Sequence, residues 1–340
     1  MPSELKIAIA CQGGGSHAAF GAGVLLGLME RPEPLNIVAL SGTSGGAMSA
    51  ALAWAGLIDR GVEDASGRVA RFWRDLEAHD LFDAIANFWS VMFARLPVTP
   101  EVSPYVYAST AEPALRRLLK VHLALDRIPM RARAAHPKLF VGATDVLSGE
   151  RVVFTGEHLT ETDLIASAAV PPLFKAVHAD KRVYWDGLFA TNPPVREFTD
   201  LPVSERPDEI WVVQINPQRR GTEPRTMQDI TDRRNELSGN VALAQELAFI
   251  DKINELVAKH GPIGDYKRIT LRVVEIGVPR LDYPSKLDRS SGLIQRLLKN
   301  GRERSAWFFE DKSLWPRPGA LTAECVTPQR EGVRSLRSVS

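Results

Sequence analysis

The 340-residue chain has little cysteine, almost no net charge and no long hydrophobic run. Its two cysteines, Cys11 and Cys325, lie near opposite ends and cannot form a disulfide framework. They lack metal-ligand spacing, and no cluster of His, Asp or Glu has it either. We therefore expect a cytoplasmic protein in a reducing compartment, without a metal or another cofactor.

Charge and hydropathy exclude two further classes of protein. The 42 Lys and Arg residues nearly balance 41 Asp and Glu residues, so no overall positive field favours a nucleic-acid partner. The longest apolar stretch, residues 45–58, is about 14 residues long, and a membrane span needs roughly 20. This stretch predicts a buried core helix. Any membrane contact is expected to be peripheral, on the inner membrane face.

The first sixty residues alternate between strand and helix patterns. Strands are predicted at 6–10 and 36–40, and helices at about 18–30 and 45–58. Such alternation predicts a parallel sheet with helices on its faces. A long helical pattern covers 226–260, with Ser238-Gly239 as a potential break. Further strands are expected at 139–144, 151–154, 183–185, 210–215 and 269–276.

The chain is divided by composition into one main domain and a C-terminal region. We expect an α/β domain over 5–280, in which 72–107 is an aromatic insertion and 210–280 a C-terminal extension. A helical segment is predicted over 281–315. The Pro- and Arg-containing tail, 316–340, has few apolar residues and is predicted to be disordered.

Gly42-Thr43-Ser44-Gly45-Gly46 forms a G-x-S-x-G element between a predicted strand and a predicted helix. Small flanking residues allow the sharp, strained turn that exposes a nucleophilic serine. The helix macrodipole then favours negative charge that develops beside the hydroxyl. A Gly/Ser-rich turn without chemistry is the alternative. The strand and helix on either side favour Ser44 as a nucleophile.

A second glycine-rich element follows the first predicted strand and comprises Gly13, Gly14, Gly15, Ser16, His17 and Ala18. Consecutive glycines allow backbone N–H groups to converge on an anion, as in an oxyanion hole. The element also satisfies a loose dinucleotide-binding pattern, which requires an acidic residue at the end of the second strand. That strand runs into Leu40-Ser41-Gly42, so the cofactor interpretation is disfavoured.

The serine requires a base, and Asp186 is the preferred candidate. A Ser-Asp-His hydrolase in that chain order would need His260, whose neighbours Lys259 and Gly261 indicate a helix C-terminus. Asp186 ends a predicted strand and is followed by Gly187. Asp-Gly alone is usually a turn, but in combination with the two glycine-rich elements it indicates a general base.

These elements resemble the motifs of the patatin-like phospholipases, which are lipid acyl hydrolases with a Ser-Asp dyad. The family has a glycine-rich oxyanion loop, a G-x-S-x-G about 30 residues later and a D-G-[GA] element after a proline-containing segment. Residues 13–18, 42–46 and 186–188 correspond to these motifs, and 166–174 resembles the segment before the aspartate. The resemblance covers roughly residues 5–200.

The resemblance implies a three-layer α/β/α fold with a mainly parallel central sheet. It also implies hydrolysis of a lipid or fatty-acyl ester through an acyl-enzyme on Ser44, with Asp186 as the base and backbone N–H groups of Gly14, Gly15 and Gly45 holding the oxyanion. Two alternatives remain open. One is an acyltransferase or thioesterase with the same dyad, and the other is a nucleotide- or lipid-binding module without turnover.

The chain departs from the family pattern at three positions. His17 stands where the family usually has a basic residue, Ala18 where it has glycine, and Leu188 where it has a small residue. A protonated His17 would assist anion binding, but a histidine of ordinary pKa is mostly neutral at pH 7. Leu188 would narrow the site or line an acyl pocket. Residues 210–276 resemble the C-terminal part of a bacterial branch and carry no assigned chemistry.

The aromatic insertion contains a strongly apolar helical face. Its members are Phe82, Ile85, Trp89 and Met92, flanked by Phe88 and Phe93. This face either packs on the core or forms a cap over the acyl groove that rests on a bilayer surface. The sequence leaves both interpretations open.

Overall fold

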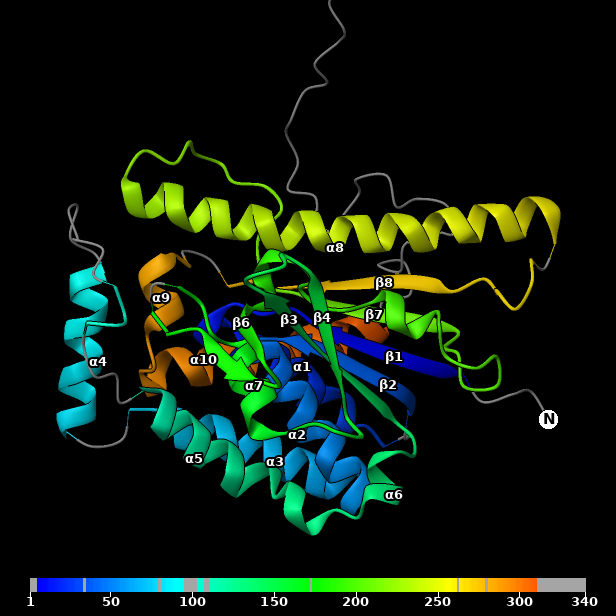
Figure 1. Cartoon of the computed structure of the whole chain (residues 1–340), viewed down its shortest axis with the longest axis horizontal. Coiled ribbons are helices and arrows are strands. Elements are labelled where there is room, and N and C mark those ends of the chain that lie inside the picture. Colours follow the sequence, from blue (N-terminus) through cyan, green and yellow to red (C-terminus); the bar gives the residue numbers. More distant parts are fainter. Residues whose placement is uncertain are drawn as a thin grey trace, which may run out of the picture.

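The computed structural model describes residues 5–32, 35–78, 81–94, 103–106, 111–171, 173–261, 263–278 and 281–310. Within these residues an eight-stranded sheet lies between two layers of helices (Figure 1). The strands are β1 (Lys6–Cys11), β2 (Asn36–Thr43), β3 (Lys138–Asp145), β4 (Arg151–Thr155), β5 (Val177–Ala179), β6 (Arg182–Asp186), β7 (Glu209–Gln214) and β8 (Thr270–Glu275). This confirms the predicted three-layer α/β/α fold.

The sheet has the order β5-β6-β3-β2-β1-β7-β8, and β4 also pairs with β3. Strands β3, β2, β1, β7 and β8 are parallel, whereas β4 and β6 run antiparallel to β3. Cys11 is paired with Gly42, and Thr43 with Gly142. The segments that follow β1 and β2 therefore leave the sheet side by side at the same edge.

The sheet is covered by helices whose bounds are α1 (Ala19–Met29), α2 (Gly45–Asp59), α3 (Val62–Leu76), α4 (Leu81–Ala94), α5 (Ala111–Leu123), α6 (Met130–Arg133), α7 (Glu161–Ser167), α8 (Met227–His260), α9 (Tyr283–Leu287) and α10 (Ser291–Glu310). Short 3₁₀ helices are η1 (Gly15–Ala18), η2 (Leu125–Arg127), η3 (Gly187–Phe189) and η4 (Arg196–Phe198). Helix α8 crosses one face of the sheet, and α1, α2, α3 and α10 lie on the other (Figure 1).

Side-chain alternation along the strands produces two cores. In β1, Ile7 and Ile9 point into the larger core with α1, α2, α3 and α10, whereas Ala8 and Ala10 point toward α8. Ile210, Val212 and Leu271 also point to this side and pack in the same core as Leu243 and Ile250 of α8. Helix α2 is buried from Gly45 to Gly56, as expected for its Ala-rich sequence. Among the described residues, no helix has the length and hydropathy needed to cross a membrane.

The structure can be compared with the predicted aromatic insertion, C-terminal extension and tail. Phe72 and Trp73 are buried core residues of α3, and the next helix, α4, begins at Leu81. Strands β7 and β8 belong to the central sheet, so the predicted extension over 210–280 supplies part of the same layer. The predicted tail, 316–340, lies outside the described residues.

Candidate active site

Ser44 occupies the turn between β2 and α2. Its backbone angles, φ 56° and ψ −130°, lie in a region that costs a non-glycine residue about 1–3 kcal/mol. The N–H of Met48 donates to Ser44 O at 3.1 Å, which starts the hydrogen bonding of α2. The N–H groups of the first turn, from Gly45 onward, therefore have no partner within the helix. This is the strained strand-to-helix turn predicted from the sequence.

Glycines are required around this turn because backbone segments pass close together. A Cβ at Gly42 would lie 2.6 Å from Ala47 N, and one at Gly46 would lie 2.6 Å from Gln12 O. A Cβ at Gly13 would lie 2.8 Å from Ser44 Cβ. The glycine-rich loop after β1 and the serine turn after β2 are therefore in direct contact.

Ser167 holds the serine turn from the other side. Ser167 is fully buried at the end of α7 and accepts a hydrogen bond from Ser44 N–H at 2.9 Å. Its own hydroxyl donates to Gly142 O, in β3, at 2.6 Å. The sequence placed Ser167 in a family-like segment but assigned it no role. Because the N–H of Ser44 is occupied, it is not free to bind an oxyanion.

Asp186 is the last residue of β6 and is 1% exposed. It pairs with Ala143 in β3, one residue beyond the pair that joins Thr43 to Gly142. A Cβ at Gly187 would lie 2.6 Å from Gly142 O, so the Asp-Gly element also approaches its neighbour closely. The register of three strands thus brings Asp186 to the serine turn.

The two oxygens of the Asp186 carboxylate differ in their hydrogen bonding. Oδ1 accepts from Leu188 N–H at 2.8 Å, whereas Oδ2 is buried without a well-formed hydrogen bond to any described residue. Burial raises the pKa of Asp186 from 3.8 to about 7. The N–H of Leu188 and the facing hydroxyl of Ser44 act in the opposite direction, because both favour the charged form. The hydroxyl and the carboxylate are therefore neighbours.

The predicted oxyanion residues have different environments. The N–H of Gly13 donates to Asn192 Oδ1 at 2.7 Å. Gly14 and Gly15 precede the first hydrogen bond of η1, from His17 N–H to Gly14 O at 3.2 Å. Their N–H groups consequently have no partner within that helix. Gly13 is held as part of the framework, and Gly14 and Gly15 remain the donor candidates in this loop. Ser16 is buried within η1.

Four buried amide side chains, which sequence reasoning missed as a group, surround the base of the loop. Gln12 Oε1 accepts from the N–H groups of Ile215 and Asn216 at 2.9 and 2.8 Å. Gln12 Nε2 donates to Asn240 Oδ1 at 3.0 Å. Asn216 Nδ2 donates to Gly13 O at 3.3 Å, and the N–H of Gly13 donates to Asn192 Oδ1. These contacts fix the loop to the end of β7, to α8 and to the segment after η3. These partners are far apart along the chain, so no local sequence pattern indicates the network.

His17 does not contribute the positive charge that was considered for it. It is 3% exposed, and burial together with the charge of Lys286 lowers its pKa from 6.5 to about 3. Its Nε2 lies 2.8 Å from Ser285 Oγ in α9. At neutral pH, His17 is therefore a neutral residue that connects the glycine-rich loop to α9. The backbone carbonyl of Lys286 also lies against Gly15, so α9 covers this loop.

Ala18 and Leu188, the other two residues that differ from the family motif, pack against neighbouring helices. The Cβ of Ala18 lies 2.6 Å from the position of a Cβ at Gly45, so Ala18 contacts the first turn of α2. Leu188 is buried and faces Gly239 of α8. His260 is exposed and is the last residue of α8. Its predicted position at a helix terminus is confirmed.

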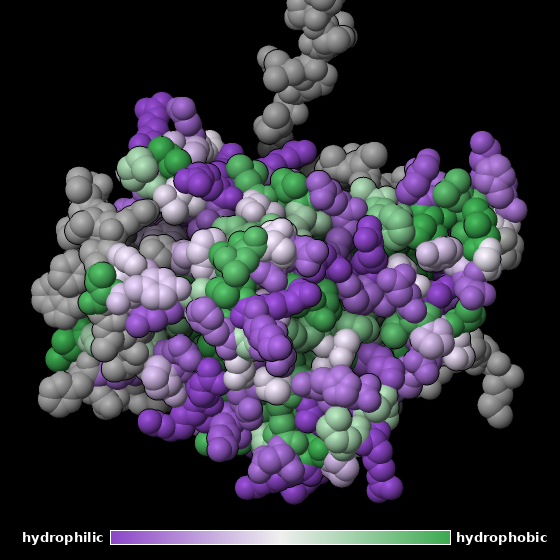
Figure 2. Space-filling model, in the orientation of Figure 1, coloured by the Kyte–Doolittle hydropathy of each residue, from purple (hydrophilic) through white to green (hydrophobic). Residues whose placement is uncertain are grey.

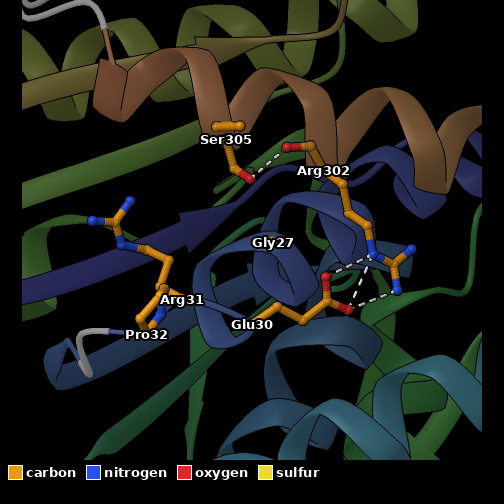
Figure 3. Close-up of a pocket in the computed structure, with 7 residues that line it drawn as sticks. Gly27, Glu30, Arg31, Pro32, Arg302 and Ser305 are labelled. Atoms are coloured by element: carbon orange, nitrogen blue, oxygen red, sulfur yellow. Dashed lines mark hydrogen bonds and ion pairs between the residues drawn. The ribbon is translucent and has the colours of Figure 1, made fainter.

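A surface hollow of about 290 Å³ lies elsewhere, between the end of α1 and α10 (Figure 3). Its lining includes Glu30 and Arg302, whose side chains form an ion pair at 3.0 Å. The hollow contains no residue of the two glycine-rich elements or of the aspartate motif. It is therefore not the candidate active site. Across the described ranges, no group of three or more His, Cys, Asp or Glu residues could hold a metal ion.

A comparison with known families confirms the family resemblance that the sequence indicated. Residues 9–199, more than half of the chain, match the family described as patatin-like phospholipase. Among solved structures, VipD from Legionella pneumophila is 16% identical, with a TM-score of 0.42; the match covers 91% of this chain and 67% of VipD. The type III effector protein ExoU is 14% identical, with a TM-score of 0.36; the match covers 89% of this chain and 52% of ExoU. No curated protein matches the chain.

Proposed function

We propose that this chain, which belongs to the patatin-like phospholipase family, hydrolyses acyl esters of lipids through an acyl-enzyme on Ser44. The observation that carries the proposal is the pairing of Ser44, on a strained turn, with the buried carboxylate of Asp186. Family membership supports lipid hydrolysis in general. The dyad mechanism and the assignment of each residue are our proposal.

In the acylation step, Ser44 Oγ attacks the ester carbonyl carbon while Asp186 Oδ2 accepts the hydroxyl proton. The carbonyl oxygen becomes an oxyanion, which accepts hydrogen bonds from the N–H groups of Gly14, Gly15 and Gly45. When the tetrahedral intermediate collapses, the bond to the alcohol breaks and Asp186 returns the proton to the departing oxygen. The N-terminus of α2 favours the transient negative charge.

In the deacylation step, Asp186 removes a proton from water, and the resulting hydroxide attacks the acyl carbon on Ser44. When the second intermediate collapses, the bond from the acyl carbon to Ser44 Oγ breaks, Asp186 returns its proton to Ser44 Oγ, and the carboxylic acid is released. An aspartate of ordinary pKa is a weak base at neutral pH, whereas a pKa of about 7 suits proton transfer in both directions. The burial of Asp186 therefore supports its proposed role.

The arrangement favours catalysis over binding without turnover. A buried carboxylate oxygen without a hydrogen bond destabilises the folded state, and so does a non-glycine residue at positive φ. A binding module would require neither feature at Ser44 and Asp186. Both are explained when the serine is a nucleophile and the aspartate its base.

The proposal is tested with a short p-nitrophenyl acyl ester. Ser44→Ala and Asp186→Asn are each expected to lower kcat at least about 1000-fold, and the double variant should be little worse than either single variant. Ser49→Ala, which replaces a buried serine of α2, should retain most activity. Losses that multiply in the double variant would contradict the dyad. Transfer of the acyl group to an added alcohol, without free acid, would indicate an acyltransferase.

A further inference from the structure

Helix α4 is attached to the rest of the molecule by a polar stripe. The side chain of Asn87, 7% exposed, donates to Asp288 Oδ1 at 2.9 Å and accepts from Arg289 N–H at 2.8 Å. Asp83, one turn earlier, forms an ion pair with the side chain of Arg289. Asp288 and Arg289 directly follow α9. Asp83 and Asn87 are spaced i and i+4, so the helix face that carries them is turned toward α9 and the residues after it.

Another face of α4 is apolar and exposed. Ile85, Phe88 and Met92 follow the i, i+3, i+7 spacing of one helical face and are 45%, 57% and 39% exposed. Asp83 is the only charged residue in the helix, and its charge is balanced by the ion pair. A contiguous apolar stripe without charge is the kind of surface that binds apolar material. We call these three residues the α4 stripe.

The α4 stripe lies at the end of the molecule that carries the candidate active site. Helix α4 stands beside α9, and α9 covers the glycine-rich loop through Lys286 O at Gly15 and Ser285 at His17 (Figure 1). Figure 2 shows hydrophobic residues at the edge of the molecule where α4 lies. One short helix therefore separates the exposed stripe from the proposed oxyanion loop.

We propose that α4 is a docking helix for a neutral lipid surface, with Ile85, Phe88 and Met92 buried at the boundary between headgroups and acyl chains. This inference rests on the proposed function, because docking at this end would hold the site against the surface that contains its substrate. The helix contains no Lys or Arg. Its attachment therefore depends on apolar burial, and anionic headgroups are not required.

The size of the helix favours a lipid surface over other occupants. Its 14 residues make a rod of about 21 Å, shorter than the roughly 30 Å hydrocarbon core, so α4 lies along the membrane. One face of such a rod, roughly 20 by 10 Å, covers about 200 Å², whereas a stable dimer needs about 800 Å² from each partner. The stripe is too small for a stable contact with a second copy.

Binding is tested in the full-length chain that carries Ser44→Ala, so that the lipid is not hydrolysed. Sedimentation with phosphatidylcholine vesicles measures the partition coefficient. Phe88→Glu combined with Met92→Glu is expected to lower it at least about tenfold, because two carboxylates would enter the boundary region. The matched control is Val203→Glu combined with Leu256→Glu, which changes side chains 50% and 38% exposed at the opposite end of the sheet. It should leave the coefficient unchanged.

A milder variant and a soluble substrate separate docking from folding and from catalysis. Phe88→Ser combined with Met92→Ser should also reduce vesicle binding and should keep the melting temperature. With Ser44 intact, both α4 variants should retain hydrolysis of a short soluble ester and lose hydrolysis of vesicle lipid. Unfolding of both variants would show that the stripe is part of the core and would overturn the proposal.

Three further results would overturn docking on neutral lipid. These are equal binding by the α4 variants and the control, binding that requires anionic lipid and disappears in high salt, and a dimer that dissociates in the α4 variants. The proposed function fails separately. If the wild type binds vesicles through α4 but shows no Ser44-dependent ester release, docking stands and hydrolysis does not. If ester release depends on Ser44 but the α4 variants bind vesicles as well as the wild type does, hydrolysis stands and docking does not.

Discussion

Asp186 illustrates, for a single residue, how burial sets the pH dependence of the proposed reaction. Its pKa is raised to about 7, and only the charged carboxylate can accept the proton of Ser44. We expect kcat/KM to fall about tenfold per pH unit below pH 7 and to level off above it. A pH–rate profile with a neutral soluble ester measures this. A Ser44-dependent rate that is constant between about pH 5 and pH 7 would contradict the raised pKa.

The same shift predicts an opposite effect on stability. The folded state holds the Asp186 proton more tightly than the unfolded chain, whose pKa is near 3.8. The free energy of unfolding should therefore decrease by a few kcal/mol as the pH rises from about 4 to about 7. Asp186→Asn cannot ionise and should lack this decrease. Its melting temperature should exceed that of the wild type by more at about pH 8 than at about pH 4.

Ser167 and Ser49 are both buried serines, and only Ser167 is hydrogen-bonded to Ser44 itself. The hydroxyl of Ser49 donates one turn back in its own helix, to Gly45 O at 3.2 Å. Ser167 in α7 accepts from Ser44 N–H, whereas Ser49 in α2 accepts from the indole N–H of Trp73 at 3.0 Å. Replacement of either by Ala leaves a buried donor unpaired, at a cost of about 1–3 kcal/mol. We expect similar losses of melting temperature in Ser167→Ala and Ser49→Ala.

The two variants should differ in their kinetics. Ser167→Ala should lower kcat roughly 10- to 100-fold with little change in KM, because the reacting hydroxyl is no longer held in place. Ser49→Ala should leave both constants nearly unchanged. An equal loss of kcat in both variants would assign Ser167 a purely structural role.

Elements with a local pattern were predictable, and contacts between distant elements were not. The predicted strands 6–10 and 36–40 correspond to β1 and β2, since alternation of strand and helix is encoded within short windows. Helix α8 continues through the potential break at Gly239, where a side chain would meet Asn192. Gly13 and Asn192 are 179 residues apart, and Gln12 and Asn240 are 228 apart. No local pattern indicates such pairs.

On the scale of the whole molecule, the C-terminal region completes the sheet that holds the site. β1 lies between β2 and β7, and the β7 end places Ile215 and Asn216 against Gln12. The family match ends at residue 199, before β7 begins. The motifs for Ser44 and Asp186 were readable within that part. The contribution of residues 210–280 to the site could not be read from the sequence, because these residues act through packing and long-range hydrogen bonds.

This dependence predicts that the matched region cannot fold alone. A chain that ends at Thr199 lacks β7 and would expose one edge of β1, and it also lacks α10, which packs against α1. We expect this chain to aggregate on expression and to show no cooperative melting. A chain that ends at Glu310 keeps every described element and should melt like the full-length protein. Cooperative melting together with Ser44-dependent ester hydrolysis by the shorter chain would show that the C-terminal region is dispensable for the site.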